Sequence, residues 1–130
     1  MNSPANLETI SRYFTSVEKG NAADIAADLF SHGSVLEILP NRLFPNGTKS
    51  GIIGLLQMCR RLISSQSFDV KSCVADGDRV WVEFVWSGTL AVPFDSLAAG
   101  SQMRGHCAII FEFDDGRIAY QRMYECFEPW

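Results

Sequence analysis

The stretch RGHCAIIFEF, DDG, RIAYQRMYECF, residues 104–127, decides the fold of this chain. Two long runs rich in Ile, Phe, Tyr and Cys stand on either side of Asp114, Asp115 and Gly116. Glycine adopts the positive φ that a tight hairpin needs, and β-branched and aromatic residues favour strands. The stretch therefore predicts two long antiparallel strands joined by a short turn.

The length of that turn decides which side chains of the two strands share a face. A two-residue loop of Asp115 and Gly116 would put Arg122 on the face that carries Ile109 and Phe111. A three-residue loop, with Gly116 in the left-handed conformation, would instead group Cys107, Ile109, Phe111 and Phe113 with Ala119, Gln121, Met123 and Glu125. We favour the three-residue loop because it gives one continuous apolar face.

The favoured loop leaves two polar side chains, Gln121 and Glu125, on the apolar face. Burying a polar group is costly unless it is hydrogen-bonded, so both residues are candidates for a site. The same register turns His106, Arg122 and Tyr124 to the other face, with His106 opposite Tyr124. With the two-residue loop, His106 would pair directly with Glu125, and a His-Glu pair would become the best candidate site.

The totals exclude several classes of protein. A chain of 130 residues predicts a single domain, residues 1–130, that can bury a core of its own. A net charge of −4, with no basic run longer than Arg60-Arg61, argues against a nucleic-acid surface. No apolar run approaches the ~20 residues of a membrane span, and the opening MNSPAN lacks the features of a signal peptide. We therefore expect a cytoplasmic protein that binds neither nucleic acid nor membrane.

The four cysteines, Cys59, Cys73, Cys107 and Cys126, lie far apart, and only two histidines accompany them. This spacing fits neither a zinc site nor a disulfide framework in a reducing compartment. We expect four small buried apolar side chains, no bound metal and no cofactor.

Capping residues and helical spacing predict three helices. We expect them from Ser3-Pro4 to Lys19-Gly20, from Asn21 to His32-Gly33, and from Ser50 to about Ile63. Tyr13 lies at the edge of the first helix's apolar stripe. Its hydroxyl can therefore reach whatever the helix covers.

Alternating apolar and polar residues predict strands over 34–39, 68–74 and 80–90. Asp76-Gly77-Asp78 predicts a turn, and Ser87-Gly88 a bulge. The irregular stretch 92–102 predicts a loop over the mouth of a pocket. The order of elements predicts an α+β fold, with three N-terminal helices packed on one face of a mainly antiparallel sheet.

This plan and particular residues resemble the family of nuclear transport factor 2, ketosteroid isomerase and the SnoaL-like polyketide cyclases. The shared features, which cover essentially the whole chain, are MNSP at the start, Ser11-Arg12-Tyr13, Leu29-Phe30, VLE at 35–37, FEF at 111–113, DGRI at 115–118 and YECFEPW at the end. The resemblance implies a cone-shaped α+β barrel with a curved sheet. Its apolar cavity would hold an apolar small molecule, with polar groups pointing inward.

The resemblance also implies roles by position. The isomerase's phenolic donor falls on Tyr13, which is retained. Its general-base aspartate falls on Ile38 or Leu39, and its protonated acid falls on Ile109, so the isomerase mechanism is not available in that form. The aspartate of the epoxide hydrolases falls on Met123, which argues against epoxide hydrolysis.

Glu125 remains as the candidate acid/base carboxyl, as in SnoaL-like cyclases. Burial would raise its pKa toward neutral, whereas a place at the open sheet end would leave it an ordinary solvated carboxylate. We predict Glu125 and Tyr13 as catalytic residues. The predicted ligand-binding residues are Gln121, Met123, Trp86, Phe84, Ile38, Cys107 and Ile109.

The outer sheet face carries apolar side chains at Trp81, Val85, Tyr120 and Tyr124, which predicts a homodimer interface that includes His106. Two functions remain open. The first is a cofactor-independent enzyme that isomerises, cyclises or dehydrates an apolar carbonyl compound. The second is a non-catalytic small-molecule-binding or dimerisation module. Replacing Glu125 by Gln would abolish turnover only in the first.

Overall fold

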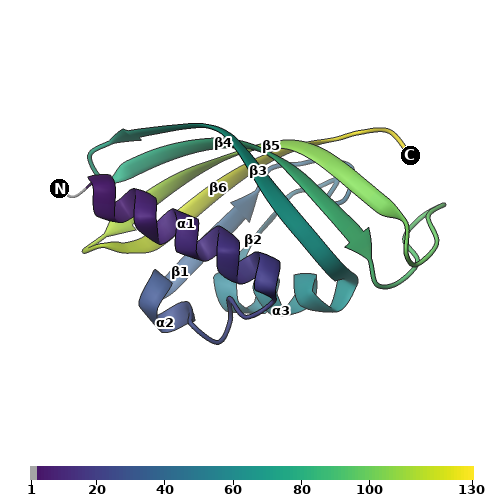
Figure 1. Cartoon of the computed structure of the whole chain (residues 1–130), viewed down its shortest axis with the longest axis horizontal. Helices are drawn as coiled ribbons and strands as arrows, with labels where there is room; N and C mark the ends of the chain where they lie inside the picture. The colour runs from purple at the N-terminus through teal and green to yellow at the C-terminus, as the bar shows by residue number, and fades with distance from the viewer. Residues whose placement is uncertain (1–2) are drawn as a thin grey trace.

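The computed structural model describes residues 3–130. Its elements are α1 (Ser3–Lys19), α2 (Ala26–Leu29), β1 (Phe30–Ile38), β2 (Thr48–Gly51), α3 (Ile52–Leu62), β3 (Ile63–Asp76), β4 (Arg79–Leu90), β5 (Gln102–Asp114) and β6 (Arg117–Phe127). The strands form one sheet in the order β2-β1-β6-β5-β4-β3, in which only β1 and β6 pair in parallel. The sheet curves over the helices, which lie on one side of it (Figure 1). The predicted α+β plan is confirmed.

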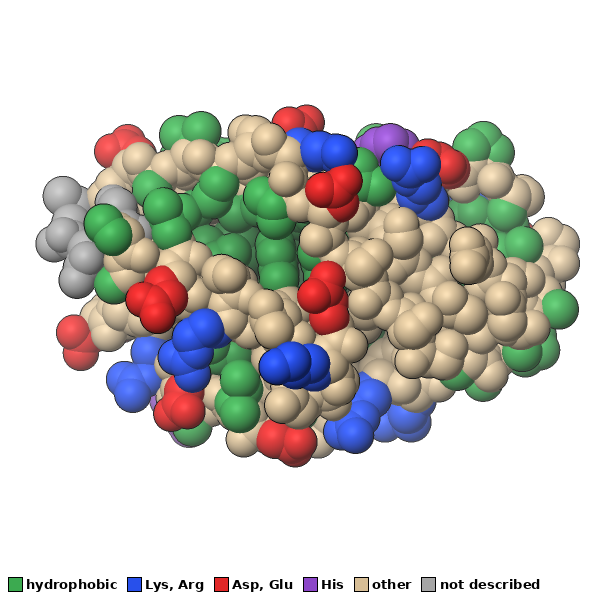
Figure 2. All heavy atoms as spheres, viewed as in Figure 1, with side chains coloured by type: hydrophobic (Ala, Val, Ile, Leu, Met, Phe, Trp, Pro, Cys, Tyr) green, Lys and Arg blue, Asp and Glu red, His purple; other side chains and the backbone are tan. Residues whose placement is uncertain are grey.

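Helix α1 spans the predicted residues and ends before Gly20, whose φ of 76° suits glycine. Its inner side buries Ile10, Tyr13 and Phe14 against the sheet. Phe14 stacks on Phe68 of β3 with ring centroids 4.6 Å apart. Figure 2 shows apolar side chains in a hollow on the face that carries α1. None of the helices described in residues 3–130 is long and apolar enough to cross a membrane.

The second helix is shorter than predicted. It ends at Leu29, and the predicted end at His32-Gly33 is wrong because the backbone of Phe30 is already extended and pairs with Ile118. Gly33, with a φ of 76°, lies instead in an irregular part of β1.

The predicted cap of the third helix is also wrong. Ser50 belongs to the short strand β2, where it pairs with Leu36. The helix follows Gly51 without a side-chain cap, and it buries Ile52 and Leu55.

The β5–β6 hairpin has a two-residue turn, so the predicted three-residue loop is wrong. Asp114 pairs with Arg117, and Asp115 and Gly116 have φ values of 51° and 78°. Positive φ at both central residues defines the type I′ turn, whose twist matches that of the flanking strands.

A bulge at Ala119 nevertheless restores most of the predicted face. Phe113 pairs with Ile118 and Glu112 with Tyr120, which leaves Ala119 as the extra residue. Ile118, fully buried, therefore takes the inward place that was predicted for Ala119. Beyond the bulge the predicted faces hold, but the predicted register is wrong by two residues, because the pairs are Phe111–Gln121, Ile109–Met123 and Cys107–Glu125.

The bulge predicted in β4 is absent, and β3 has two register shifts instead. Ser87 and Gly88 pair regularly with both neighbouring strands. Gly88 is required by packing, because a Cβ atom there would lie 2.3 Å from Cζ2 of Trp86. In β3 the register shifts between Ile63 and Ser65 and again between Val70 and Ser72.

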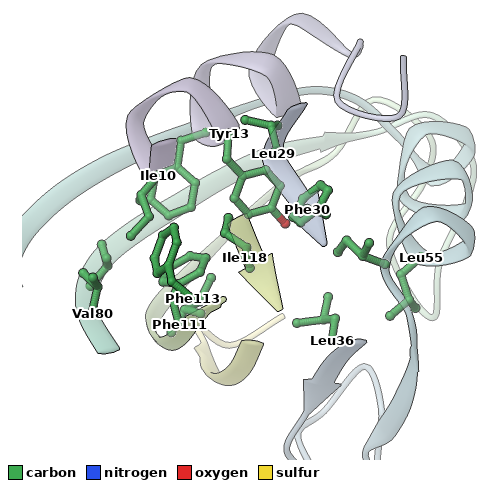
Figure 3. Packing of buried hydrophobic residues seen from close by; sticks show 14 of the residues in the cluster. Ile10, Tyr13, Leu29, Phe30, Leu36, Leu55, Val80, Phe111, Phe113 and Ile118 are labelled. Carbon is green, nitrogen blue, oxygen red and sulfur yellow. The ribbon is translucent and has the colours of Figure 1, made fainter. Parts of the chain in front are cut away.

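The core lies between the helices and the inner face of the sheet. In Figure 3, Ile10 and Tyr13 point from α1 toward Phe111, Phe113 and Ile118 of the sheet. Tyr13 meets Phe30 edge-on, with ring centroids 5.1 Å apart. Tyr13 also meets Phe111 edge-on, so these aromatic side chains form part of the core beneath α1.

Candidate functional site

The inner face of β6 carries Gln121, Met123 and Glu125 in successive inward positions. The paired strands place three side-to-side rows across the sheet: Leu36, Gln121 and Phe111; Ile38, Met123 and Ile109; and Glu125, Cys107 and Phe84. Trp86 follows Phe84 on the same face of β4, where it pairs with Gly105. Eight of the nine predicted site residues, all except Tyr13 of α1, thus lie on adjoining strands of one face.

Glu125 lies beside the loop that follows β1 and is partly accessible. Asn41 Nδ2 donates a hydrogen bond to its Oε1 at 3.3 Å. Burial raises the pKa of this carboxyl to about 7, although the hydrogen bond from Asn41 lowers it. The predicted rise of the pKa toward neutral is confirmed.

The sequence analysis missed Asn41. The Asn41 side chain is held in place because its Oδ1 accepts from the backbone N–H groups of Leu43 and Phe44, at 2.7 and 3.1 Å. Such side-chain turns are typical of Asn after Pro in a loop, so Pro40-Asn41 was the available signal. A fixed amide at this point orients the Glu125 carboxyl.

Tyr13 is buried under α1 with its hydroxyl directed toward the sheet (Figure 3). Burial raises the pKa of this phenol, and the nearby Gln121 side chain offsets part of the rise. The charge of Cys59 raises the pKa further. Tyr13 is therefore a neutral hydroxyl that can donate a hydrogen bond at physiological pH.

Gln121 is fully buried on the inner face. Within residues 3–130, neither Nε2 nor Oε1 of this amide has a hydrogen-bond partner of normal geometry. Its neighbours in the row are Leu36 and Phe111, both apolar. The Tyr13 hydroxyl lies near this amide without a hydrogen bond of normal geometry. A buried amide without such a partner is unusual and needs an explanation, such as a bound group or a trapped water.

Two cysteine thiols, those of Cys107 and Cys59, lie near the polar groups of the site. Cys107 pairs with Glu125 across the strands, and burial, with a smaller contribution from Glu125, raises its thiol pKa to about 12. Cys59 on α3 is accessible, yet the surrounding protein raises its pKa, as does Glu125. The prediction of four buried cysteines is wrong, because only Cys107 is buried while Cys59, Cys73 and Cys126 are exposed.

Cys59 is accessible because it lines a cavity of about 380 Å³. The cavity lies between the end of α1, the turn after it, α3 and the first residues of β3. Gln66 also lines it and accepts a hydrogen bond at 2.9 Å from Nε1 of Trp86. The cavity therefore reaches residues that contact or perturb the predicted site.

A second cavity, of about 510 Å³, is lined by β3, β4, β5 and the residues around Trp130. None of the predicted site residues lines it, and its walls are rich in Ser and Thr hydroxyls. Phe84, predicted to line the ligand site, is packed between Phe14 and Phe68 at centroid distances of 5.2 and 5.4 Å. Phe84 is therefore part of the packed core.

His106 lies on the outer face, as predicted, but opposite Cys126 and not Tyr124, which pairs with Ala108. Its Nε2 is 2.9 Å from Oε2 of Glu128. The register puts Cys107, and not His106, across from Glu125, so the alternative His-Glu125 pair is excluded.

No group of three or more His, Cys, Asp or Glu side chains in residues 3–130 is arranged to hold a metal ion. The polar groups that face inward include a carboxyl, a phenol, two amides, two thiols and the Ser34 hydroxyl. They can transfer a proton and donate hydrogen bonds. The absence of a cofactor stays a prediction.

Comparison with known proteins agrees with the fold described above. The family model of the SnoaL-like domain matches residues 10–121. None of the curated proteins matches the chain at a significant level.

Several solved structures have the same fold. A proposed polyketide cyclase of Xanthomonas campestris pv. campestris has a TM-score of 0.78 and 18% identity, with 95% of this chain and 92% of that chain covered. IdmH of Streptomyces antibioticus, also a proposed polyketide cyclase, has a TM-score of 0.74 and 20% identity, with 92% and 91% covered. An LEH-like epoxide hydrolase of M. tuberculosis has a TM-score of 0.73 and 15% identity, with 95% and 84% covered. At these identities the likeness establishes the fold.

Proposed function

Because the chain belongs to the SnoaL-like domain family, within the nuclear transport factor 2-like superfamily, we propose that it catalyses cofactor-independent proton transfer on an apolar carbonyl compound. The observation that carries the proposal is the position of the Glu125 carboxyl on the inner sheet face, paired with Cys107 and held by a hydrogen bond from Asn41. Burial there raises its pKa to about 7. A base with a pKa near the working pH combines a useful ionised fraction with strength as an acceptor.

In the proposed reaction, ionised Glu125 removes a proton from the carbon next to a carbonyl, and the electron pair moves onto the carbonyl oxygen as an enolate. The protonated carboxyl then returns the proton to another atom of the same molecule. Isomerisation, cyclisation and dehydration all begin with this step. Asn41, at 3.3 Å, keeps the carboxyl oriented.

Tyr13 is proposed to donate a hydrogen bond to an oxygen of the ligand. The apolar contacts would come from the buried Ile38, Ile109 and Cys107, and from the half-buried Met123 and Trp86. These side chains would exclude water and fix the conformation of a flexible ligand, which lowers the barrier of an intramolecular step.

The exchange of α-hydrogens of 2-tetralone for deuterium, followed by proton NMR in D₂O, tests the proposal without the natural substrate. The wild-type protein should accelerate exchange, with a rate that rises with pH through about 7 as Glu125 ionises. Glu125→Gln should reduce the acceleration at least about 100-fold, since general bases contribute ~10²–10⁴.

Glu83→Gln is the matched control, because Glu83 is an exposed carboxylate of β4 on the outer face. It should exchange 2-tetralone at the wild-type rate. Binding of 2-tetralone with no exchange above the Glu125→Gln background would reject catalysis and favour the non-catalytic binding module.

We also propose that the outer face pairs with a second copy of the chain. Val74, Trp81 and Tyr124 lie on this face with exposed fractions of 58%, 37% and 45%. Light scattering after size exclusion should give a dimer mass, and Trp81→Glu should give a monomer. Val92→Glu, an equally exposed apolar position in a loop, is the control.

The proposed location is the cytoplasm. All four cysteines are free, and three of them are exposed. Exposed thiols persist in a reducing compartment, whereas oxidising compartments favour disulfides.

A further inference from the structure

Two neighbouring buried side chains of the sheet have unpaired polar atoms. Among the residues described, Ser34 Oγ and both polar atoms of Gln121 are buried without a hydrogen-bond partner. Leu36 of β1 pairs with Gln121, and Ser34 lies two residues before Leu36 on the same inward face. Exposed fractions are 4% for Ser34 and 0% for Gln121. Buried polar atoms without partners cost stability, so their retention at adjacent positions needs an explanation.

The Tyr13 hydroxyl belongs to the same cluster. Its pKa responds to the Gln121 side chain, so the two groups are close. Around them are Phe30, Leu36 and Ile118, which are buried and apolar (Figure 3). Three hydrogen-bonding side chains thus face one region of an otherwise apolar interior.

This cluster is distant from Glu125. Gln121 and Glu125 are four residues apart on one strand, which corresponds to about 13 Å. A carbonyl oxygen and the hydrogen that becomes acidic beside it are separated by the carbonyl carbon and the α-carbon alone. The cluster and Glu125 therefore cannot act on the same carbonyl group of one ligand.

We propose that Ser34, Gln121 and Tyr13 form a second polar subsite, which binds a hydroxyl group at the far end of an elongated apolar substrate. The inference rests on the proposed function of Glu125 at the reacting end. A hydroxyl is the matching group because the Gln121 amide presents an unpaired donor and an unpaired acceptor together. An ether or a simple ketone accepts only, and would leave Oε1 of Gln121 unpaired.

The cavity between α1 and α3 is the proposed entrance for the ligand, although its lining includes none of Ser34, Gln121, Tyr13 and Glu125. Cys59 lines that cavity, and its thiol interacts electrostatically with Tyr13 and with Glu125. Its volume of about 380 Å³ is within the ordinary range of small-molecule sites. A ligand that enters beside Cys59 would have to extend inward from this cavity to reach the subsite and the carboxyl.

Calorimetric titration with 2-naphthol and 2-methoxynaphthalene tests the subsite, because the two probes differ in the hydroxyl hydrogen. The wild-type protein should bind 2-naphthol about tenfold more tightly, the effect of one or two buried hydrogen bonds. Gln121→Met, of similar size and without polar hydrogens, should abolish the preference and raise the melting temperature. Ser34→Ala should reduce the preference.

Glu83→Gln is the matched control, because Glu83 is an exposed carboxylate of the outer face, and it should retain the preference for 2-naphthol. Equal binding of both probes by the wild-type protein, as expected if the cluster holds only trapped water, would overturn the subsite. So would a preference that survives Gln121→Met. Tyr13→Phe repeats the test if Gln121→Met does not fold. Loss of 2-tetralone exchange concerns Glu125 alone, so failure of the subsite and failure of the catalytic proposal are distinguishable.

Discussion

Replacing Glu125 by Gln should make the stability of the protein less sensitive to pH in one window. The pKa of Glu125 is raised from 4.5 to about 7 in the folded chain. Between these values the folded state binds more protons at this group than the unfolded state does. The stability that the neutral carboxyl contributes is therefore fully present below pH 4.5, and is lost as pH rises through about 7.

At 1.36 kcal/mol per pKa unit, the shift corresponds to about 3 kcal/mol. Because the carboxyl is partly accessible to solvent, we expect about 2–3 kcal/mol. The free energy of unfolding of Glu125→Gln, minus that of the wild type, should rise by this amount between pH 4.5 and 8.

Urea unfolding of both proteins at several pH values measures this difference. All other titrating groups are shared, so their contributions cancel. With an m-value of about 2 kcal/mol/M, the difference between the two midpoints should change by about 1–1.5 M. A difference that stays constant from pH 4.5 to 8 would show that Glu125 ionises as it does in water, and would remove the basis for its role as a base.

Three further substitutions test the packing and the turns. Gly88→Ala should destabilise the protein by about 1–3 kcal/mol in urea unfolding, because the new methyl group lies 2.3 Å from the Trp86 ring; an unchanged midpoint would contradict the packing described. Asp115→Asn should raise the melting temperature by recovering part of the roughly 1–2 kcal/mol that a left-handed residue costs, and a lower one would argue against the type I′ turn. Arg42→Ala removes a guanidinium that lies 3.7 Å from the Trp130 ring and donates to its carbonyl at 2.8 Å. Stability should change by less than about 1 kcal/mol, while exchange of the Glu128 amide, which donates to the Arg104 carbonyl at 2.8 Å, should become faster. Protection of this amide equal to wild type would show that Arg42 does not hold the segment that follows β6.

The sequence predicted the fold well where a regular repeat of apolar residues continued over many positions. Helix α1 and strands β4 to β6 occupy the expected residues, because each buries one continuous apolar face. Short elements were less predictable. Phe30 fits the apolar side of a helix and of a strand equally, and its pairing with Ile118, 88 positions later, decides between them.

The site was predicted in part. Glu125 and Gln121 were identified as polar residues at inward positions, and both do lie on the inner face of the sheet. The three-residue turn from which this was inferred was wrong. A bulge at Ala119 places these side chains inward, and no local sequence signal marks that bulge. Asn41 was missed since its contact with Glu125 joins residues 84 positions apart. The unpaired state of the Gln121 amide depends on all the side chains around it, and no sequence pattern reports it.

The extra residue at Ala119 shifts by one position which side chains of β6 point inward. Ahead of it, the type I′ turn fixes which side chains alternate inward; after it, the alternation continues in the opposite phase. Deleting this single alanine would exchange Gln121, Met123 and Glu125 for their neighbours without altering any of those side chains. Which side chains of β6 reach the interior thus depends partly on the number of residues between the turn and the site. A sequence comparison that matches residue types but ignores such an insertion would assign the wrong side chains to the site.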